Sequence, residues 1–493
     1  MTGRRPGAKK VVLVVIDALA PEALERAIEE GSAPVLARLM EEGHYADDCV
    51  STFPSVTPVA SAAIATGLGP EEHLIPSMNW YHRGEERYVE YGTSFGASRA
   101  HGLFRSLQDT VYNMNLSHLT QERRTVFEHL DDADLRTACT TYMIYRGRYR
   151  HEPSGDSPYW RLAEAAQFRH AVWGARELFY ADLFDSQRTG CQSTLGMPGQ
   201  RDQHAACVGA QLVEHGLFDF LLFSLPDNDR HSHRAGPDAQ PASIADADRA
   251  LERLMEPVGG PDAFLADHAV IVMSDHSQDT VREASNLSAS LDGWRVMAPV
   301  DSDPEAAQVA VCPGSRSAQI YILDSSRREI LARQVAEDLE HVRGVDVTAR
   351  LEAGYGEVWT PRGDLRFRPG GELLDARGNT WEVEGDHAAL DLFVSAGEVI
   401  AGDYPDPLRR LWSALACPRA GEVIISAQPG FEFTDWGGSD HVGGGSHGSL
   451  HKCDSLGVLL MHGLGAPARA DGAQWSIEDV TPLVLDHFGI REG

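Results

Sequence analysis

The chain has 493 residues and a formal net charge of −30 at pH 7, which results from 43 basic and 73 acidic side chains. A protein this acidic repels polyanions, which excludes a general binder of nucleic-acid polymers or of anionic membrane surfaces. The composition, 42% hydrophobic and 24% charged, is typical of a folded globular protein, and the length allows one large α/β domain with insertions or two to four domains.

Cysteine usage and the N-terminal residues bear on the cellular compartment. The seven cysteines are odd in number, widely spaced and without a C-x-x-C pair, so we expect reduced, mostly buried thiols. Basic residues precede the apolar segment 11–16, as in a signal peptide, but Asp17 interrupts a run that is already too short. No apolar run reaches the roughly 18 residues of a membrane span. We therefore expect a cytoplasmic protein without a membrane span.

Hydrophobic patterns predict an α/β core with a mostly parallel sheet. Residues 11–16 form a continuous, mostly β-branched run of the kind found in parallel strands buried on both faces. Several predicted strands end in acidic or histidine-bearing turns, and ligands of open α/β sheets bind at the carboxyl ends of strands. Further strand patterns lie at residues 45–51, 218–225, 268–273, 423–426 and 456–461, and helix patterns at 21–31, 34–43, 202–215, 244–254 and 477–488.

Two segments interrupt this core. Residues 86–199 lack a regular period, and we expect an inserted helical and loop segment there. Residues 286–422 have the pattern of a small α+β subdomain, with a strand, a helix and a strand followed by hairpins. The core is then expected at residues 1–85, 200–285 and 423–493.

The segment 51–67 places a hydroxyl group at the start of a predicted helix. Thr57 stands at the N-cap position, Pro58 at the first helical position, and Gly67 where a left-handed C-terminal residue is favoured. Free N–H groups and the helix dipole at such an N-terminus bind anions, so a phosphoryl group would lie beside a potential nucleophile. An ordinary capped helix is the alternative for this segment taken alone.

Residues 226–237 contain two overlapping D-x-x-x-H pairs. Asp227 is paired with His231, and Asp229 with His233. On a helix this spacing aims a carboxylate oxygen and an imidazole nitrogen at one point, which suits a Zn²⁺ site. The spacing alone leaves open which pair binds a metal, and a charged surface loop is the alternative.

Other metal-ligating side chains follow predicted strands or lie in a flexible loop. Asp17 ends the first strand, and Asp275 and His276 lie in the segment 274–277, directly after the strand at 268–273. Beyond a strand end, two adjacent side chains can turn towards one ion. His447 lies in a glycine-rich loop that allows the backbone to approach a metal closely, although an exposed hinge is the alternative.

Five motifs occur along the chain in one order, and this order resembles the type I phosphodiesterase/nucleotide pyrophosphatase family of the alkaline phosphatase superfamily. The resemblance implies an alkaline-phosphatase-like α/β core, with a mostly parallel central sheet flanked by helices and with inserted α+β cap segments. The motifs are Asp17 after the first strand, F-P-x-x-T at 53–57, D-x-x-x-H-x-x-G-P at 229–237, S-D-H at 274–276 and G-S-H-G at 445–448.

The resemblance also implies a site for two zinc ions, with manganese or iron as alternatives. The pair Asp227 and His231 lacks the family's distance to the Gly-Pro, and His441 and His451 lack the G-x-H-G setting. The implied ligands are Asp229, His233 and His447 for one ion, and Asp17, Thr57, Asp275 and His276 for the other.

The implied activity is the hydrolysis of phosphodiester or pyrophosphate bonds in a small phosphate ester or nucleotide. The Thr57 oxygen, its pKa lowered by zinc, would attack phosphorus and form a phosphothreonine. Two alternatives remain, a phosphomonoesterase with the same site and a catalytically silent metal-binding protein. A sulfatase is disfavoured because the Cys/Ser-x-Pro-x-Arg sequence is absent, and a cofactor-independent phosphoglycerate mutase because that enzyme uses serine and manganese.

The sequence departs from the family pattern near the nucleophile. Asn79 is the candidate for the asparagine that binds the phosphoryl oxygen, although it lies one residue from the expected register. Ala60 and Ser61 replace the family's Asn-His, which leaves the preference for a nucleobase open. Trp80, Tyr81 and the run 145–150 are candidates for stacking on a substrate, with an exposed hairpin as the alternative. The oligomeric state stays open.

Overall fold

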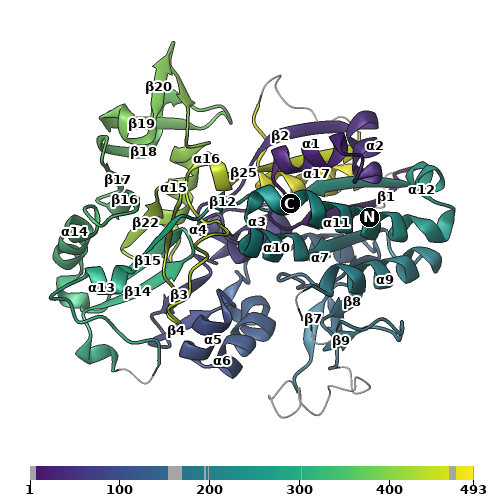
Figure 1. The fold of residues 1–493 in the computed structure, drawn as a ribbon, viewed down its shortest axis with the longest axis horizontal. Coiled ribbons are helices and arrows are strands. Elements are labelled where there is room, and N and C mark those ends of the chain that lie inside the picture. The colour runs from purple at the N-terminus through teal and green to yellow at the C-terminus, as the bar shows by residue number, and fades with distance from the viewer. Residues whose placement is uncertain are drawn as a thin grey trace.

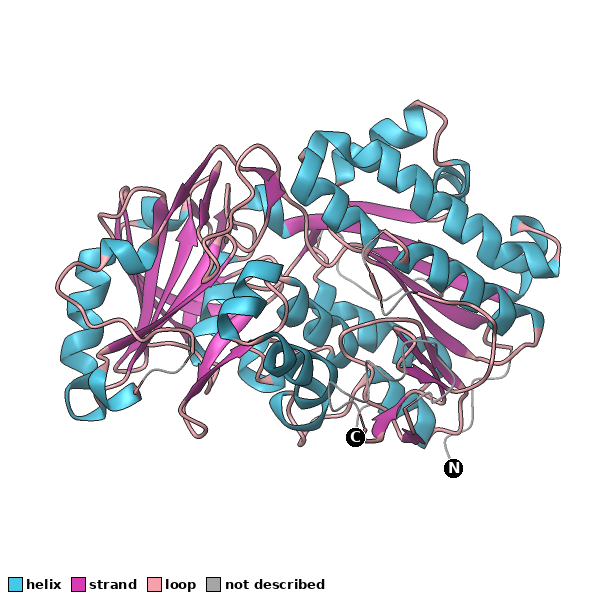
Figure 2. Cartoon of the chain, turned by 60° about the horizontal axis from the view of Figure 1, so that its bottom comes forward, coloured by secondary structure: helices cyan, strands magenta, loops and turns pink. Residues whose placement is uncertain are grey.

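The computed structural model describes residues 7–153, 169–193, 196–197, 199–300, 303–465 and 473–491. Two sheets lie side by side along the long axis of the molecule, and helices pack against both (Figure 1 and Figure 2). The first sheet contains the N-terminal strand, and the second is built from residues 309–427. The α/β class expected from the sequence is confirmed.

The first sheet has eight strands. Five neighbouring strands, from β11 across to β8, run parallel to one another. The outer strands pair antiparallel with their neighbours. The order across the sheet is β2 (His44–Val50), β25 (Leu456–His462), β11 (His268–Met273), β1 (Lys10–Ile16), β10 (Phe220–Leu225), β5 (Thr137–Cys139), β8 (Glu177–Tyr180) and β9 (Phe184–Asp185).

Strand β1 shows why this sheet must be covered on both faces. Its residues from Val11 to Ile16 are all buried, and alternate side chains enter two different hydrophobic clusters. One cluster is covered by α1 (Pro21–Glu29), α2 (Pro34–Glu42), α9 (Arg201–Glu214), α11 (Gln240–Met255) and α12 (Pro261–Asp267). The other is covered by α3 (Thr57–Thr66), α7 (Val126–Asp132) and α17 (Val480–Phe488).

The second sheet has nine strands and is mostly antiparallel. Helices α14 (Arg328–Leu339) and α15 (Pro407–Ala416) pack against opposite faces of this sheet. Ile424 belongs to the hydrophobic cluster that contains α15, and the next residue of the strand, Ile425, belongs to the cluster that contains α14. The strands are β14 (Val309–Gly314), β15 (Ser317–Ile322), β22 (Val423–Ala427), β16 (Val345–Glu352), β17 (Tyr355–Thr360), β18 (Gly363–Leu374), β21 (Glu398–Ala401) and β20 (Leu392–Ser395), with β19 (Thr380–Gly385) paired to β18.

Two placements expected from the sequence are wrong. Strands β5 and β8 belong to the central sheet, although they lie within 86–199, and β22 belongs to the second sheet, although it lies within 423–493. Strand β5 has only three residues, Thr137–Cys139, and is too short to give a periodic signal. Strand β22 is buried throughout, so its apolar run looks like that of a central parallel strand.

Shorter elements connect the two sheets and complete the inserted segments. Residues 154–168 of the first inserted segment lie outside the described residues. The described elements are α4 (Pro70–His73), β3 (Asn79–His82), β4 (Arg87–Glu90), α5 (Phe95–His101), α6 (Leu103–Gln108), the π-helix Asp109–His118, β6 (Tyr149–His151), β7 (Val172–Gly174), α10 (Asp227–Ala235), β12 (Asp279–Thr280), β13 (Glu283–Ser285), α13 (Leu287–Ser290), β23 (Phe431–Phe433), β24 (Gly445–Ser446) and α16 (Lys452–Ser455).

Two further expectations concern the cysteines and the membrane. Cys191 and Cys207 form a disulfide, so the expectation that all seven cysteines are reduced is wrong. Four of the other cysteines are buried and one is half-buried. Within the described residues, no helix is both long enough and apolar enough to cross a membrane.

Arg410 of α15 joins the second sheet's lobe to the core. Its guanidinium group is buried and donates hydrogen bonds to the carbonyl oxygens of Pro405 (3.0 Å), Leu450 (2.9 Å) and Thr52 (3.0 Å), and to the Ser455 hydroxyl (2.6 Å). Thr52 precedes α3 and Leu450 follows the glycine-rich loop. One cation therefore satisfies acceptors from three separate segments.

We expect Arg410→Leu to lower the free energy of unfolding by about 3 kcal/mol, because it leaves buried acceptors unpaired. Urea unfolding followed by tryptophan fluorescence measures this loss. The control is Arg333→Ala, which removes an exposed pair with Glu337 and should cost about 0.5 kcal/mol or less. Equal unfolding midpoints for the two variants would contradict this role of Arg410.

Candidate metal centre and active site

The predicted ligands come together at the carboxyl edge of the central sheet. Asp17 directly follows β1, Asp275 and His276 follow β11, and α10 begins two residues after β10. Ala18 has a left-handed backbone (φ 58°), and its N–H donates a 3.1 Å hydrogen bond to Asp275 Oδ1. The turns after two neighbouring parallel strands are thereby tied to each other.

Both D-x-x-x-H pairs lie on α10, but only Asp229 and His233 face the other candidate ligands. Asp229 Oδ1 lies 3.4 Å from His233 Nε2 and 3.6 Å from His447 Nε2. Asp227 instead accepts hydrogen bonds from the backbone of residues 199 and 202, and His231 Nε2 lies 3.1 Å from the Ala239 carbonyl oxygen. Ligand atoms of Asp229, His233 and His447 all lie within 4.8 Å of one another, so these three could hold one metal ion.

A second group of ligand atoms meets the same 4.8 Å limit and consists of Asp17, Asp229 and His276. His276 Nε2 lies 3.7 Å from Asp17 Oδ1 and 3.5 Å from Asp275 Oδ2. The Thr57 hydroxyl oxygen lies 3.2 Å from the same His276 nitrogen. The structure therefore brings together all seven residues that the sequence predicts as metal ligands.

Helix α3 holds Thr57 at its N-terminus, but one position away from the prediction. Val56 is the N-cap residue, Thr57 is the first helical residue and Pro58 the second, so the N-cap assignment is wrong. Within the part of the chain that the structure describes, no side chain caps this helix start, so the Thr57 hydroxyl is not used as a cap and is available to the site. Gly67 ends the helix in the left-handed conformation (φ 71°), as expected.

The three imidazoles share one arrangement of hydrogen bonds. In each, Nδ1 lies within hydrogen-bond distance of a backbone carbonyl oxygen: Gly445 for His233 (2.8 Å), Ser277 for His276 (3.1 Å) and Ser55 for His447 (2.9 Å). A proton on Nδ1 satisfies this carbonyl and leaves the Nε2 lone pair directed at the carboxylates. These are the tautomers that a metal ion requires.

The charges of the cluster do not balance without a cation. Burial and the neighbouring carboxylate of Asp275 raise the pKa of Asp17 well above its usual value, and burial raises the pKa of Asp275 to about 6. Burial lowers the pKa of each of the three imidazoles to about 4, so they are neutral at pH 7. The buried Asp17 Oδ1 has no hydrogen-bond partner. Nitrogen and oxygen donors of this kind fit a divalent metal ion.

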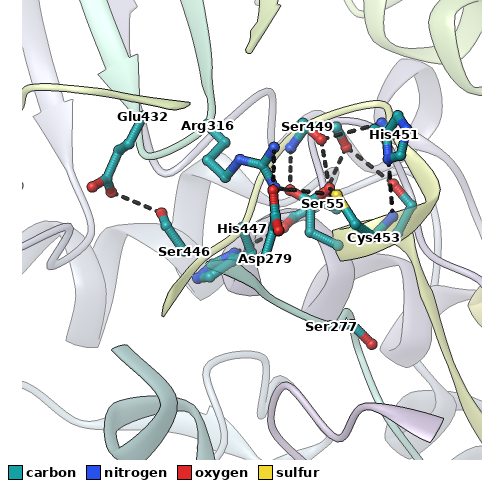
Figure 3. Close-up of polar contacts among 12 residues, drawn as sticks. Ser55, Ser277, Asp279, Arg316, Glu432, Ser446, His447, Ser449, His451 and Cys453 are labelled. Carbon is teal, nitrogen blue, oxygen red and sulfur yellow. Dashed lines mark hydrogen bonds and ion pairs between the residues drawn. The ribbon is translucent and has the colours of Figure 1, made fainter. Parts of the chain in front are cut away.

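A buried arginine from the second sheet's lobe fixes the loop that carries His447. The Arg316 N–H donates to the His447 carbonyl oxygen (2.9 Å), and the guanidinium lies 3.1 Å from Asp279 and 3.3 Å from Asp454 (Figure 3). Arg316 is 0% exposed. Asp454 also accepts the Ser449 N–H at 2.8 Å. The position of His447 therefore depends on contacts between the two lobes.

The two histidines considered as alternatives to His447 lie in different surroundings. His441 stacks on His233 with ring centroids 4.2 Å apart, and its Nδ1 lies 2.7 Å from Glu432 Oε1. Burial lowers the pKa of His441, but the ion pair with Glu432 outweighs this and leaves the pKa raised. His451 belongs to neither group of metal-ligating atoms and caps α16. Glu432 carried no signal in the sequence, because it matches none of the motifs.

Asn79 and several of the residues considered for stacking are buried. Asn79 is 0% exposed, and its amide donates to Thr93 Oγ1 (3.1 Å) and to the Pro313 carbonyl oxygen (2.7 Å). It does not line the cavity that contains Thr57. Trp80, Tyr81 and Tyr145 are packed in the hydrophobic core, and Arg146 is buried against Glu128. Their burial disfavours a stacking role for these four side chains, and the rest of the run 145–150 does not line the cavity that contains Thr57.

A cavity of about 900 Å³ opens at the cluster. The predicted ligands Asp17, Thr57, Asp229, His233, Asp275 and His447 line it, together with His441 and three arginines. The arginines are Arg201, Arg230 and Arg234, and none of them is a defining residue of a sequence motif. Two of them lie directly after Asp229 and His233 on α10, and this adjacency is the signal that could have identified them.

The sequence was also compared with known families and structures. Residues 11–450 match the model of the type I phosphodiesterase/nucleotide pyrophosphatase family. The chain belongs to this family. Members of this metal-dependent family hydrolyse phosphoric esters and anhydrides, so the enzyme class expected from the sequence is confirmed. No curated protein matches the sequence.

Solved structures share the fold of this family member at low sequence identity. Phosphonoacetate hydrolase from Sinorhizobium meliloti 1021, in complex with phosphonoformate, is 16% identical with a TM-score of 0.54, and the match covers 97% of this chain and 96% of that one. Murine ectonucleotide pyrophosphatase/phosphodiesterase 5 is 13% identical with a TM-score of 0.57, over 98% and 96% of the two chains. At these identities the likeness shows the fold.

We expect His447→Ala and Asp229→Ala to lose bound metal, because each removes a ligand atom that faces two others. Elemental analysis of purified, dialysed protein measures the loss. The matched control is His231→Ala on the same helix as Asp229, which removes an imidazole bonded to a backbone carbonyl and should keep the full metal content. Full occupancy in His447→Ala, or equal losses in all three variants, would contradict these ligand assignments.

The pKa shifts predict that metal leaves the two groups in order as the pH falls. In the metal-free protein burial raises the pKa of Asp17 well above its usual value, and below about pH 6 Asp275 also holds a proton. A cation must displace these protons, so below pH 6 its affinity falls by at least about tenfold per pH unit. The imidazoles with Asp229 hold the pKa of that carboxyl below its usual value despite its burial, and His233 and His447 gain protons only near pH 4.

Titration of metal-free protein with zinc at pH 7.5, 6.0 and 5.0 tests this order. We expect one binding step to weaken progressively below pH 6 while the other changes little. If both binding steps weaken in parallel, the site with Asp17 and Asp275 and the site with Asp229, His233 and His447 do not titrate separately, and the predicted order is wrong.

Proposed function

We propose that the chain is a two-zinc phosphodiesterase or nucleotide pyrophosphatase that works through a phosphothreonine at Thr57. The observation that carries this proposal is the Thr57 hydroxyl, which lies at the N-terminus of α3 and 3.2 Å from His276 Nε2. A hydroxyl at a helix N-terminus, surrounded by buried carboxylates and imidazoles, has the surroundings of an activated nucleophile.

The proposed ligand sets follow the two groups of donor atoms. Zinc is proposed because neutral imidazoles with carboxylates suit it, and manganese or iron are the alternatives. Asp229, His233 and His447 would hold one ion, and Asp17, Thr57, Asp275 and His276 would hold the other.

When bound, two such ions neutralise the carboxylates, lower the pKa of a coordinated hydroxyl and stabilise charge on the attacking and leaving oxygens. Thr57 Oγ1 then attacks phosphorus, forming one P–O bond as the bond to the leaving group breaks. The Thr57 N–H and the positive end of the α3 dipole would favour the anionic phosphoryl group, since Pro58 has no N–H and the N–H groups of Val59 and Ala60 bond Val56. Water hydrolyses the phosphothreonine in a second displacement and regenerates the hydroxyl.

The cavity supports a small anionic substrate despite the acidity of the chain. Arg230 and Arg234 line it, and among the described residues neither has a carboxylate within ion-pairing distance. Unpaired cations at a cavity attract phosphate esters locally where the net charge of −30 would repel them. Murine ectonucleotide pyrophosphatase/phosphodiesterase 5 has been solved with AMP as an inactive variant, which supports a nucleotide or similar ester here.

The size of the cavity favours a diesterase over a monoesterase. A volume of about 900 Å³ lies at the upper end of the range for small-molecule sites and exceeds what one phosphoryl group fills. The extra volume suits an organic group on each side of phosphorus, or on one side of an anhydride.

We expect Thr57→Ala to lower kcat by at least about a thousandfold while metal remains bound, because the other ligands stay in place. Hydrolysis of bis-p-nitrophenyl phosphate by zinc-loaded protein measures the rate. The matched control is Thr66→Ala at the far end of the same helix, whose hydroxyl bonds only the Ala62 carbonyl and which should keep the wild-type rate. Near-normal turnover in Thr57→Ala would exclude this nucleophile.

The same assay distinguishes the candidate activities. We expect faster hydrolysis of bis-p-nitrophenyl phosphate than of p-nitrophenyl phosphate at equal concentrations. A preference for the monoester would favour a phosphomonoesterase. No turnover of either ester by metal-loaded protein would favour a catalytically silent metal-binding protein.

A further inference from the structure

Helices α5 and α6 expose apolar side chains at the mouth of the catalytic cavity. Phe95 is 73% exposed, Phe104 61%, Leu103 39% and Leu107 37%. All four line the same cavity as Thr57. Clusters of exposed, large apolar side chains are uncommon on soluble surfaces and mark binding sites when they border a cavity.

The two helices are oriented with their polar residues inward. Ser98, His101, Ser106 and Asp109, at or just beyond these helices, are buried, whereas the apolar side chains face outward. A stable surface helix normally buries its apolar face instead. Four large apolar side chains exposed together therefore point to a ligand that covers them.

Buried polar contacts hold the helices in this orientation. Asp109 is 0% exposed and accepts hydrogen bonds from Arg87 Nη1 at 2.7 Å and Nη2 at 2.9 Å. At the other end, Ser94 Oγ caps α5 by accepting the Ala97 N–H at 2.9 Å and also bonds Asp435. Figure 1 shows α5 and α6 beside the hairpin strand β4, which carries Arg87. The apolar surface is therefore anchored at both ends.

Continuity with the catalytic cluster identifies the occupant. Asp17 and Thr57 of the catalytic cluster line the same cavity as Tyr142, Val111 and Phe104. A group covalently attached to a phosphoryl unit at Thr57 can therefore reach the apolar surface. A membrane surface or a second copy of the chain would cover the outer side chains but would not explain the apolar interior wall.

We propose that Phe95, Leu103, Phe104 and Leu107 bind a long apolar substituent of the substrate, so that the substrate is a phosphodiester with an alkyl or acyl chain. This inference rests on the proposed hydrolase function and specifies its substrate class. We call these four side chains the specificity wall, because they would select substrates by their apolar group, whereas the metal-ligating cluster would carry out the reaction.

The test compares p-nitrophenyl phosphodiesters whose second group is methyl, butyl or octyl, with zinc-loaded protein. For each methylene that becomes buried, kcat/KM should rise by about fourfold. The double variant L103S/F104S should lower the ratio of octyl to methyl kcat/KM by at least about tenfold. The matched control is Leu116→Ser, which removes a side chain that is 45% exposed but does not line this cavity, and it should keep the wild-type ratio.

The outcomes separate this inference from the proposed function. Hydrolysis of the methyl ester with no dependence on chain length would retain the hydrolase and overturn the specificity wall. If no ester is hydrolysed, calorimetry with octylphosphonate and methylphosphonate decides: tighter binding of octylphosphonate that L103S/F104S removes supports the wall without the hydrolase, and equal binding overturns it.

Two other occupants would also overturn the inference. Sedimentation would detect a dimer that L103S/F104S dissociates, and flotation with neutral phosphatidylcholine vesicles would detect membrane binding that the same variant removes. Either result, combined with an unchanged octyl to methyl ratio in L103S/F104S, would assign these side chains to an interface with a second copy or with a bilayer.

Discussion

The structure depends on the burial of three carboxylates at one edge of a parallel sheet. Asp17, Asp229 and Asp275 converge with neutral imidazoles, and one Asp17 oxygen has no hydrogen-bond partner. Like charges at this separation in a low-dielectric site cannot all ionise without a compensating cation. The pKa values of Asp17 and Asp275 are raised for this reason, after burial itself. Burying neighbouring carboxylates destabilises the metal-free fold, but it creates a site where bound cations can supply the positive charge that a reaction on an anionic substrate requires.

Both lobes of the molecule contribute to the geometry of this cluster. Parallel strands bring Asp17, Asp275 and α10 to one edge, which is the usual position of ligands in open α/β sheets. His447 comes from a later loop, and Arg316 of the second sheet holds its backbone. The second lobe is therefore part of the catalytic framework, whereas α5 and α6 border the substrate cavity.

The sequence predicted the positions of the candidate site residues better than it predicted which strands belong to which sheet. Ligands at strand ends, D-x-x-x-H spacing and a helix start at Thr57 are local patterns, and the structure brings those residues together. The short strand β5 and the buried strand β22 were misplaced, because sheet membership depends on distant pairing. The burial of Asn79 and Trp80 was not foreseen, because exposure is not encoded in residue type. The buried Arg316 and the partner Glu432 belong to no motif.

The most direct test of the central claim is the number of metal ions per chain in active wild-type protein, measured by native mass spectrometry and by anomalous scattering from crystals. We predict two ions about 4 Å apart, one beside Asp229, His233 and His447 and one beside Asp17, Asp275 and His276. Full activity in a protein that has been stripped of metal and carries none would contradict this prediction.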